Sequence, residues 1–139
     1  MNKTVGLALV TAFGFLAQPV LADGQIYECK VSNTRSQGNW LPEVLFIGHD
    51  RAAKKVIVSD PIILYFNDSQ PVEGKVDTDN KKRITFTWRL RADANGQSAN
   101  MAYRATYMKA TGRLNISGSP LGFENRYTSS GKCEVKPLK

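Results

Sequence analysis

The sequence predicts an all-β protein, a small antiparallel barrel or sandwich of seven or eight strands whose termini are joined by a disulfide. Three observations lead to this prediction. Short apolar runs with a period of two are separated by turn-forming residues. No long segment has the 3.6-residue period of an amphipathic helix. The two cysteines lie near opposite ends of the chain that follows an expected signal peptide.

Residues 1–22 are expected to be a signal peptide. Lys3 precedes an apolar run from Val5 to Leu16, and residues 20–22 (VLA) offer small side chains of the kind that a signal peptidase reads. The run is short for a bilayer span, which favours a cleaved signal peptide over the alternative, an uncleaved membrane anchor. No second long apolar segment follows. We therefore expect a single mature domain, residues 23–139, that is periplasmic or secreted and has no membrane span.

Cys29 and Cys133 are the only cysteines. In an exported protein an even pair indicates a disulfide, which would tie the first strand to the last. Two unpaired buried thiols are the alternative. If the bond exists, the last strand must return beside the first.

The longest strand-like runs lie between Arg83 and Thr111, on either side of a predicted turn at Asn95–Gly96. The first run alternates between an apolar face and a basic, threonine-rich face. The apolar face consists of Ile84, Phe86, Trp88 and Leu90, and the other of Arg83, Thr85, Thr87, Arg89 and Arg91. In the second run, residues 101–110, both faces are mixed, so the inward side is open.

The other predicted strands are residues 24–32, 43–48, 55–59, 62–66, 72–76, 113–118 and the last stretch, 123–135. Tyr27, Cys29 and Val31 share the core face of the first of these. Residues 49–55 (HDRAAKK) could form one helical turn instead of a loop. Gly131 fits a bulge or a close backbone approach. Residues 79–80 are expected at the tip of a second hairpin.

Catalysis is not expected. His49 is the only histidine, and although a triad with Ser59, Ser129 or Ser130 can be imagined, the chain has no G-x-S-x-G motif. With both cysteines in a bridge, zinc would lack ligands. No G-x-G-x-x-G or P-loop pattern occurs, so no nucleotide cofactor is expected.

Calcium is not expected either. Asp77 and Asp79 alternate like calcium ligands, but Lys81 and Lys82 stand where further ligands and the glycine of an EF-hand loop belong. The sequence thus predicts no metal and no cofactor.

The composition offers more for binding. The formal net charge is +7 and becomes +6 when Lys3 leaves with the signal peptide. The basic row Arg83, Arg89 and Arg91, with Arg104 on the neighbouring strand, could follow an anionic polymer because alternate strand residues lie about 7 Å apart. The alternative is a solvated face that keeps the sheet soluble. Nucleic acid is not expected, since Phe86 and Trp88 lie opposite the arginines and could not stack bases beside them.

Trp40 follows a turn-rich loop and has two interpretations. It could be a platform for a ligand, or it could fold over one end of the core, where a large aromatic buries much apolar area.

The frame of Tyr27-x-Cys29 in the first strand and Gly131-Lys132-Cys133 in the last resembles that of small periplasmic β-barrels, including the inhibitors of c-type lysozyme. In that family a serine and a tyrosine enter the lysozyme cleft, and this chain has no copy of that motif. Its positive charge also departs from what a binder of a basic lysozyme would carry. Residues 100–133 are similar to part of a group of exported bacterial proteins without assigned activity, which implies a fold and a compartment only.

From the sequence we therefore predict an exported binding protein rather than an enzyme. An anionic glycan, lipopolysaccharide or an exported protein is the expected partner class. Inhibition of an exported enzyme is the first alternative, and hydrolysis with His49 is the second.

Overall fold

The computed structural model describes residues 14, 24–34, 38–94 and 96–138. The expected signal peptide, apart from Gly14, lies outside the described residues, as does Asn95 of the predicted turn.

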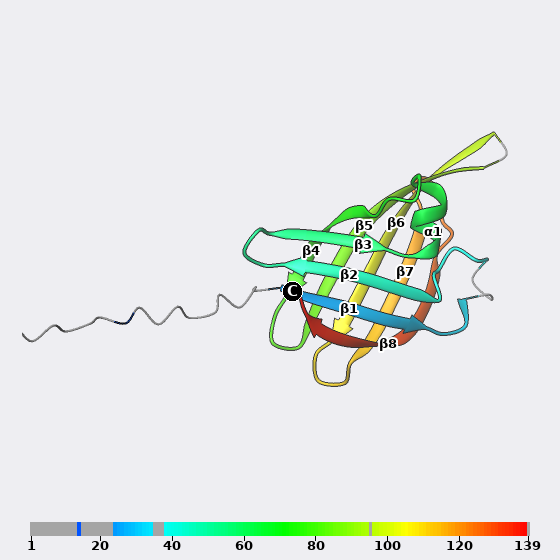
Figure 1. Cartoon of the computed structure of the whole chain (residues 1–139). Helices are drawn as coiled ribbons and strands as arrows, with labels where there is room; N and C mark the ends of the chain where they lie inside the picture. Colours follow the sequence, from blue (N-terminus) through cyan, green and yellow to red (C-terminus); the bar gives the residue numbers. More distant parts are fainter. Residues whose placement is uncertain (1–13, 15–23, 35–37, 95, 139) are drawn as a thin grey trace, which may run out of the picture.

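The described residues form a closed antiparallel barrel of eight strands in the order of the sequence, with one short helix (Figure 1). The elements are β1 (Gly24–Val31), β2 (Val44–Asp50), β3 (Lys55–Ser59), α1 (Pro61–Phe66), β4 (Val72–Asp79), β5 (Arg83–Ala94), β6 (Gln97–Met108), β7 (Arg113–Pro120) and β8 (Tyr127–Pro137). The all-β prediction is confirmed, as a barrel and not a sandwich. Closure removes the exposed sheet edges that an open sheet of this size would have.

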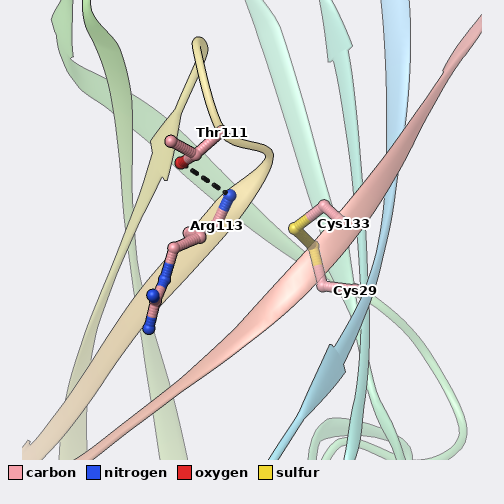
Figure 2. The surroundings of a disulfide bond; sticks show 4 residues. All are labelled: Cys29, Thr111, Arg113 and Cys133. Atoms are coloured by element: carbon pink, nitrogen blue, oxygen red, sulfur yellow. Dashed lines mark hydrogen bonds between the residues drawn. A yellow bond between two sulfur atoms is a disulfide. The ribbon is translucent and has the colours of Figure 1, made fainter.

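The barrel closes where β1 pairs with β8. The register runs from Gln25 opposite Pro137 to Val31 opposite Gly131, and it places Cys29 directly opposite Cys133. These two residues form a disulfide with their Cα atoms 4.0 Å apart, which bridges the two neighbouring strands (Figure 2). The predicted bond between the first and last strands is confirmed.

Gly131 lies in this seam, and its predicted close backbone approach is confirmed. A Cβ atom built on Gly131 would overlap the carbonyl oxygen of Lys30 in β1. Because Gly131 has no side chain, the backbones of β1 and β8 can approach each other closely here. The next residue, Lys132, is the register partner of Lys30.

Side chains fill the barrel interior. The four apolar residues of β5 are all buried, as predicted, and so are Tyr27, Cys29 and Val31 of β1. Tyr27 contacts both Phe86 and Tyr107 edge-to-face with ring centroids 5.2 Å apart. Trp88 stacks on Tyr103 at 5.4 Å. Eight strands typically enclose a space just wide enough for side chains, and here aromatic rings occupy it.

The long hairpin of β5 and β6 is confirmed, with twelve paired positions from Arg83↔Met108 to Ala94↔Gln97. Its turn uses Gly96 at a φ of +75°. The structure also identifies the inward side of β6, because Met101, Tyr103 and Ala105 are buried. Thr85 differs from the expectation of an exposed outer row. It is buried, and its hydroxyl lies 2.9 Å from that of Thr106 on β6.

The prediction of a strand at residues 62–66 is wrong, since this segment is α1. Asp60 caps the helix by accepting a hydrogen bond from the Ile63 amide at 2.8 Å, and Pro61 occupies the first turn. An aspartate followed by proline is a helix-start signal, and it overrides the apolar run in this segment. Residues 51–54 form a turn between β2 and β3, which resolves the choice between a loop and a helical turn.

A β-bulge interrupts β4 between Val76 and Thr78. Val76 lies opposite Phe86 and Asp79 opposite Ile84, and both partners are interior residues. The extra residue, Asp77, therefore changes which side the following residues face. Asp79 is directed to the end of the barrel, where it contacts Arg51 at 3.4 Å and Lys109 at 2.7 Å.

No helix among the described residues is long and apolar enough to cross a bilayer.

The close approach of β1 and β8 predicts that replacing two different glycines by alanine changes the free energy of unfolding unequally. Gly131→Ala should lower the free energy of unfolding by about 3 kcal/mol or more, because the new methyl group forces β1 away from β8. Gly48→Ala is the matched control in β2, since the nearest atom to its Cβ would be 4.0 Å away. Urea unfolding of both variants measures the difference, and equal stabilities would contradict a tight seam.

Candidate ligand-binding groove

The outer surface of β4 to β8 carries a row of polar side chains that crosses the strands. Strand register aligns Lys75, Thr87, Arg104, Ser117 and Thr128, one from each strand. Neighbouring strands are about 4.8 Å apart, so the row is about 19 Å long. It consists of cationic and hydroxyl groups and includes no aromatic side chain.

Two adjoining hollows of about 660 and 690 Å³ follow this row. They share Arg104, Ser117 and Arg126, and we call them together the outer groove. Arg126 comes from the connection between β7 and β8. The groove is open to solvent along its length and lies on the outside of the barrel.

The charge of the outer groove is mainly positive. Lys75, Arg89, Arg104 and Arg126 line it, and Glu73 is the one carboxylate that does so. Arg104 contacts Asp77 of the bulge at 2.8 Å, but both side chains are about half exposed, so this pair contributes at most about 1 kcal/mol. Arg89 and Arg126 make no ion pair with any described residue. The groove therefore presents cations that a bound anion could contact.

The structure divides the predicted basic row. Arg89 and Arg104 both line the outer groove. Arg83 begins β5 at the opposite end of the barrel and lines neither hollow. Arg91 lies near the tip of the β5–β6 hairpin, where its guanidinium contacts Asp93 at 3.2 Å. Hydrogen bonds from Ser98 and Arg91 lower the pKa of Asp93. Arg91 is thus engaged locally, away from the groove.

Trp40 lies at the end of the barrel near α1, not in the outer groove. Its ring stacks on Phe66 of α1 with centroids 6.2 Å apart. Its carbonyl accepts a hydrogen bond from the Tyr103 hydroxyl at 2.9 Å. These contacts match the interpretation of an aromatic residue folded over one end of the core. In Figure 1, α1 covers the end of the barrel from which the β5–β6 hairpin projects.

Two buried acidic groups lie beneath this cover. Burial raises the pKa of Asp60 to about 6, although hydrogen bonds from the Ile63 and Ile62 amides oppose the shift. Burial also raises the pKa of Tyr103, and the charge of Asp60 adds to that effect. Tyr103 therefore stays protonated and donates to Trp40. Asp60 is ionised at neutral pH at a cost in stability.

The structure separates His49 from the serines considered for a triad. His49 is buried, and its ring contacts Phe86 edge-to-face at 5.7 Å inside the barrel. Ser129 and Ser130 line the outer groove, and Ser129 donates a hydrogen bond to the carbonyl of Ser32. Ser59 lies opposite Phe46, an exposed residue of β2. The three serines thus lie on β3 and β8, with none beside the imidazole.

Asp77 and Asp79 do not converge, because the bulge directs one to Arg104 and the other to Arg51 and Lys109. Within the described ranges, no group of three or more histidine, cysteine, aspartate or glutamate side chains is placed to hold a metal ion.

Sequence reasoning missed Lys75 and Arg126 as groove residues. Lys75 alternates with apolar neighbours in β4, so its outward direction could be predicted, but its register with Arg104 could not. Arg126 lies in an irregular connection that has no periodicity. Only the arrangement of strands brings these two cations beside Arg89 and Arg104.

No family model, curated protein or solved structure matches this chain.

The buried carboxylate predicts a pH effect that Asp60→Asn should remove. Because the pKa of Asp60 is about 6 in the folded protein and 3.8 ordinarily, its stabilising contribution is present below about pH 4 and is lost as the pH rises through 6. Asparagine keeps the cap without the charge. The variant should therefore gain about 2–3 kcal/mol over the wild type between about pH 4 and pH 7. Urea unfolding across this range measures the difference, and a constant difference would contradict the assignment.

Proposed function

We propose that this protein is an exported, non-catalytic binding protein that recognises an anionic polymer of the cell envelope, such as an acidic glycan or the lipopolysaccharide core, through the outer groove. The observation that carries the proposal is the groove itself, with its four cations, its one lining carboxylate and its row of hydroxyl groups.

The chemistry of the lining favours a sulfated, phosphorylated or carboxylated glycan. Guanidinium groups form paired hydrogen bonds with oxyanions, and hydroxyl side chains such as Thr87 and Ser117 can exchange hydrogen bonds with sugar hydroxyls. Trp88 and Tyr103 line the groove, but both rings are buried, so neither presents an exposed face on which a nucleobase could stack. Its length of about 19 Å suits several sugar units and not a single small ion.

The disulfide supports the expected compartment, because such bonds persist in oxidising environments outside the cytoplasm. A periplasmic or secreted location is the finer form of this proposal. The expected signal peptide in residues 1–22 agrees with it.

Short dextran sulfate chains test the proposal, with unsulfated dextran of the same length as the matched ligand. The mature protein should bind only the sulfated chains, and binding should weaken as salt shortens the screening length from about 10 Å at 0.1 M to about 3 Å at 1 M. The double variant Arg89→Ala/Arg126→Ala should bind at least about tenfold more weakly, since each contact contributes on the order of 1 kcal/mol. Isothermal titration calorimetry measures both effects.

The control is Arg83→Ala/Arg113→Ala, which removes the same charge at the first residues of β5 and β7, outside the groove. It should keep near wild-type affinity. An equal loss in both double variants would mean that net charge acts, not the groove. Capture of one exported enzyme from an envelope extract, with no binding to sulfated chains, would favour the inhibitor alternative instead.

A further inference from the structure

A third hollow, of about 430 Å³, lies in the barrel wall between β3 and β4, and we call it the wall hollow. It exists because these strands pair over three positions only, from Val56↔Gly74 to Val58↔Val72. Beyond Gly74, β4 continues to Asp79 along β5, whereas β3 extends no further than its first residue, Lys55, which follows the turn from β2. The edge of β4 beyond Gly74 therefore has no strand partner on this side.

Gly74 helps to keep the wall thin at this point. A Cβ atom at Gly74 would lie 3.1 Å from a methyl carbon of Val56 and 3.0 Å from the carbonyl oxygen of Thr87. No side chain from this position can fill the gap between the strands. The wall hollow also adjoins the outer groove, because Gly74 and Lys75 line both.

The wall hollow has a cationic rim and a histidine. Arg51, Lys54 and Lys75 line it together with the carboxylate Asp79. Asp79 already contacts two cations, Arg51 at 3.4 Å and Lys109 at 2.7 Å, so it does not cancel the charge of the two lysines. Lys54 and Lys75 form no ion pair with any described residue. Excess positive charge thus faces the hollow.

Arg51 also lies close to Tyr27, a residue of the barrel interior. Its charge and its hydrogen bond lower the pKa of Tyr27, opposing the larger effect of burial, so the two groups lie close together. The Tyr27 hydroxyl donates to Gln25 at 2.9 Å. The guanidinium thus contacts Asp79 and lies close to Tyr27. His49, 6% exposed, lines the same hollow and rests on Phe86.

We propose that the wall hollow is a second binding site, distinct from the outer groove, for a small molecule that carries one phosphate or carboxylate group. Lys54, Lys75 and Arg51 contact the oxyanion, and the remainder of the ligand lies against His49 and Val56. The volume falls in the range of 300–1,000 Å³ that is usual for small-molecule sites, so a sugar-sized ligand fits.

The single histidine provides a direct readout, since every imidazole C–H signal of the mature protein in a ¹H–¹³C NMR spectrum belongs to His49. Inorganic phosphate, glucose 1-phosphate and galacturonate serve as probes, with glucose as the neutral control. The charged probes should shift the His49 signal in a saturable manner, and glucose should not. Stronger binding of glucose 1-phosphate than of phosphate would indicate a sugar phosphate, and stronger binding of galacturonate would indicate a carboxylate ligand.

Lys54→Ala should weaken the binding of each charged probe at least tenfold, whereas Lys81→Ala, with the same charge loss in the β4–β5 turn, should leave it unchanged. Absence of a saturable His49 shift, an equal effect of glucose, or equal affinities of the two variants would overturn the proposal. Lys54 does not line the outer groove, so dextran sulfate binding by Lys54→Ala should stay at the wild-type level. The two sites can therefore fail independently.

Discussion

The pairing of β1 with β8 is the contact on which the rest of this structure depends. The seven other neighbouring pairs join strands that are consecutive in the chain, so each connection brings a strand back beside the one before it. The seam alone joins segments about a hundred residues apart, and closing so long a loop has an entropic cost. The Cys29–Cys133 bond removes much of that cost, because it restricts the unfolded chain. In the chain-entropy model, a disulfide that closes a loop of this length stabilises the folded state by roughly 4–5 kcal/mol. Gly131 permits the close backbone approach that the register requires.

Both candidate sites follow from the way the wall is built. Where pairing is long and regular, as between β5, β6 and β7, the outer surface is a continuous sheet on which register aligns hydroxyl groups and cations. Where pairing is short, as between β3 and β4, the wall is hollowed and interior residues such as His49 line the opening. The bulge at Asp77 connects the two regions. It supplies one carboxylate to Arg104 on the outer surface and turns Asp79 towards Arg51 at the barrel end.

Local patterns were sufficient to predict the strands, the long hairpin and the disulfide. Alternation in residues 84–90 identifies the buried face because a strand places successive side chains on opposite sides. The same rule failed at residues 62–66, where an apolar run of strand length is a helix held by the Asp60 cap. Alternation also could not place the bulge in β4, since the one extra residue between Val76 and Thr78 leaves no signal in the composition. The outer groove was half predicted: Arg89 and Arg104 belong to it, but Lys75 and Arg126 join them only through register and a loop.

Nuclear Overhauser effects across the seam test the central claim most directly. Directly opposite residues in non-hydrogen-bonded antiparallel pairs bring their Hα atoms close together, and the short Cα separation of Cys29 and Cys133 identifies them as such a pair. The closed seam predicts strong Hα–Hα contacts for Cys29 with Cys133 and for Tyr27 with Val135, and the second contact should persist when both cysteines are replaced by alanine. If these contacts are missing, or connect residues in a shifted register, then β1 and β8 do not close the barrel as described.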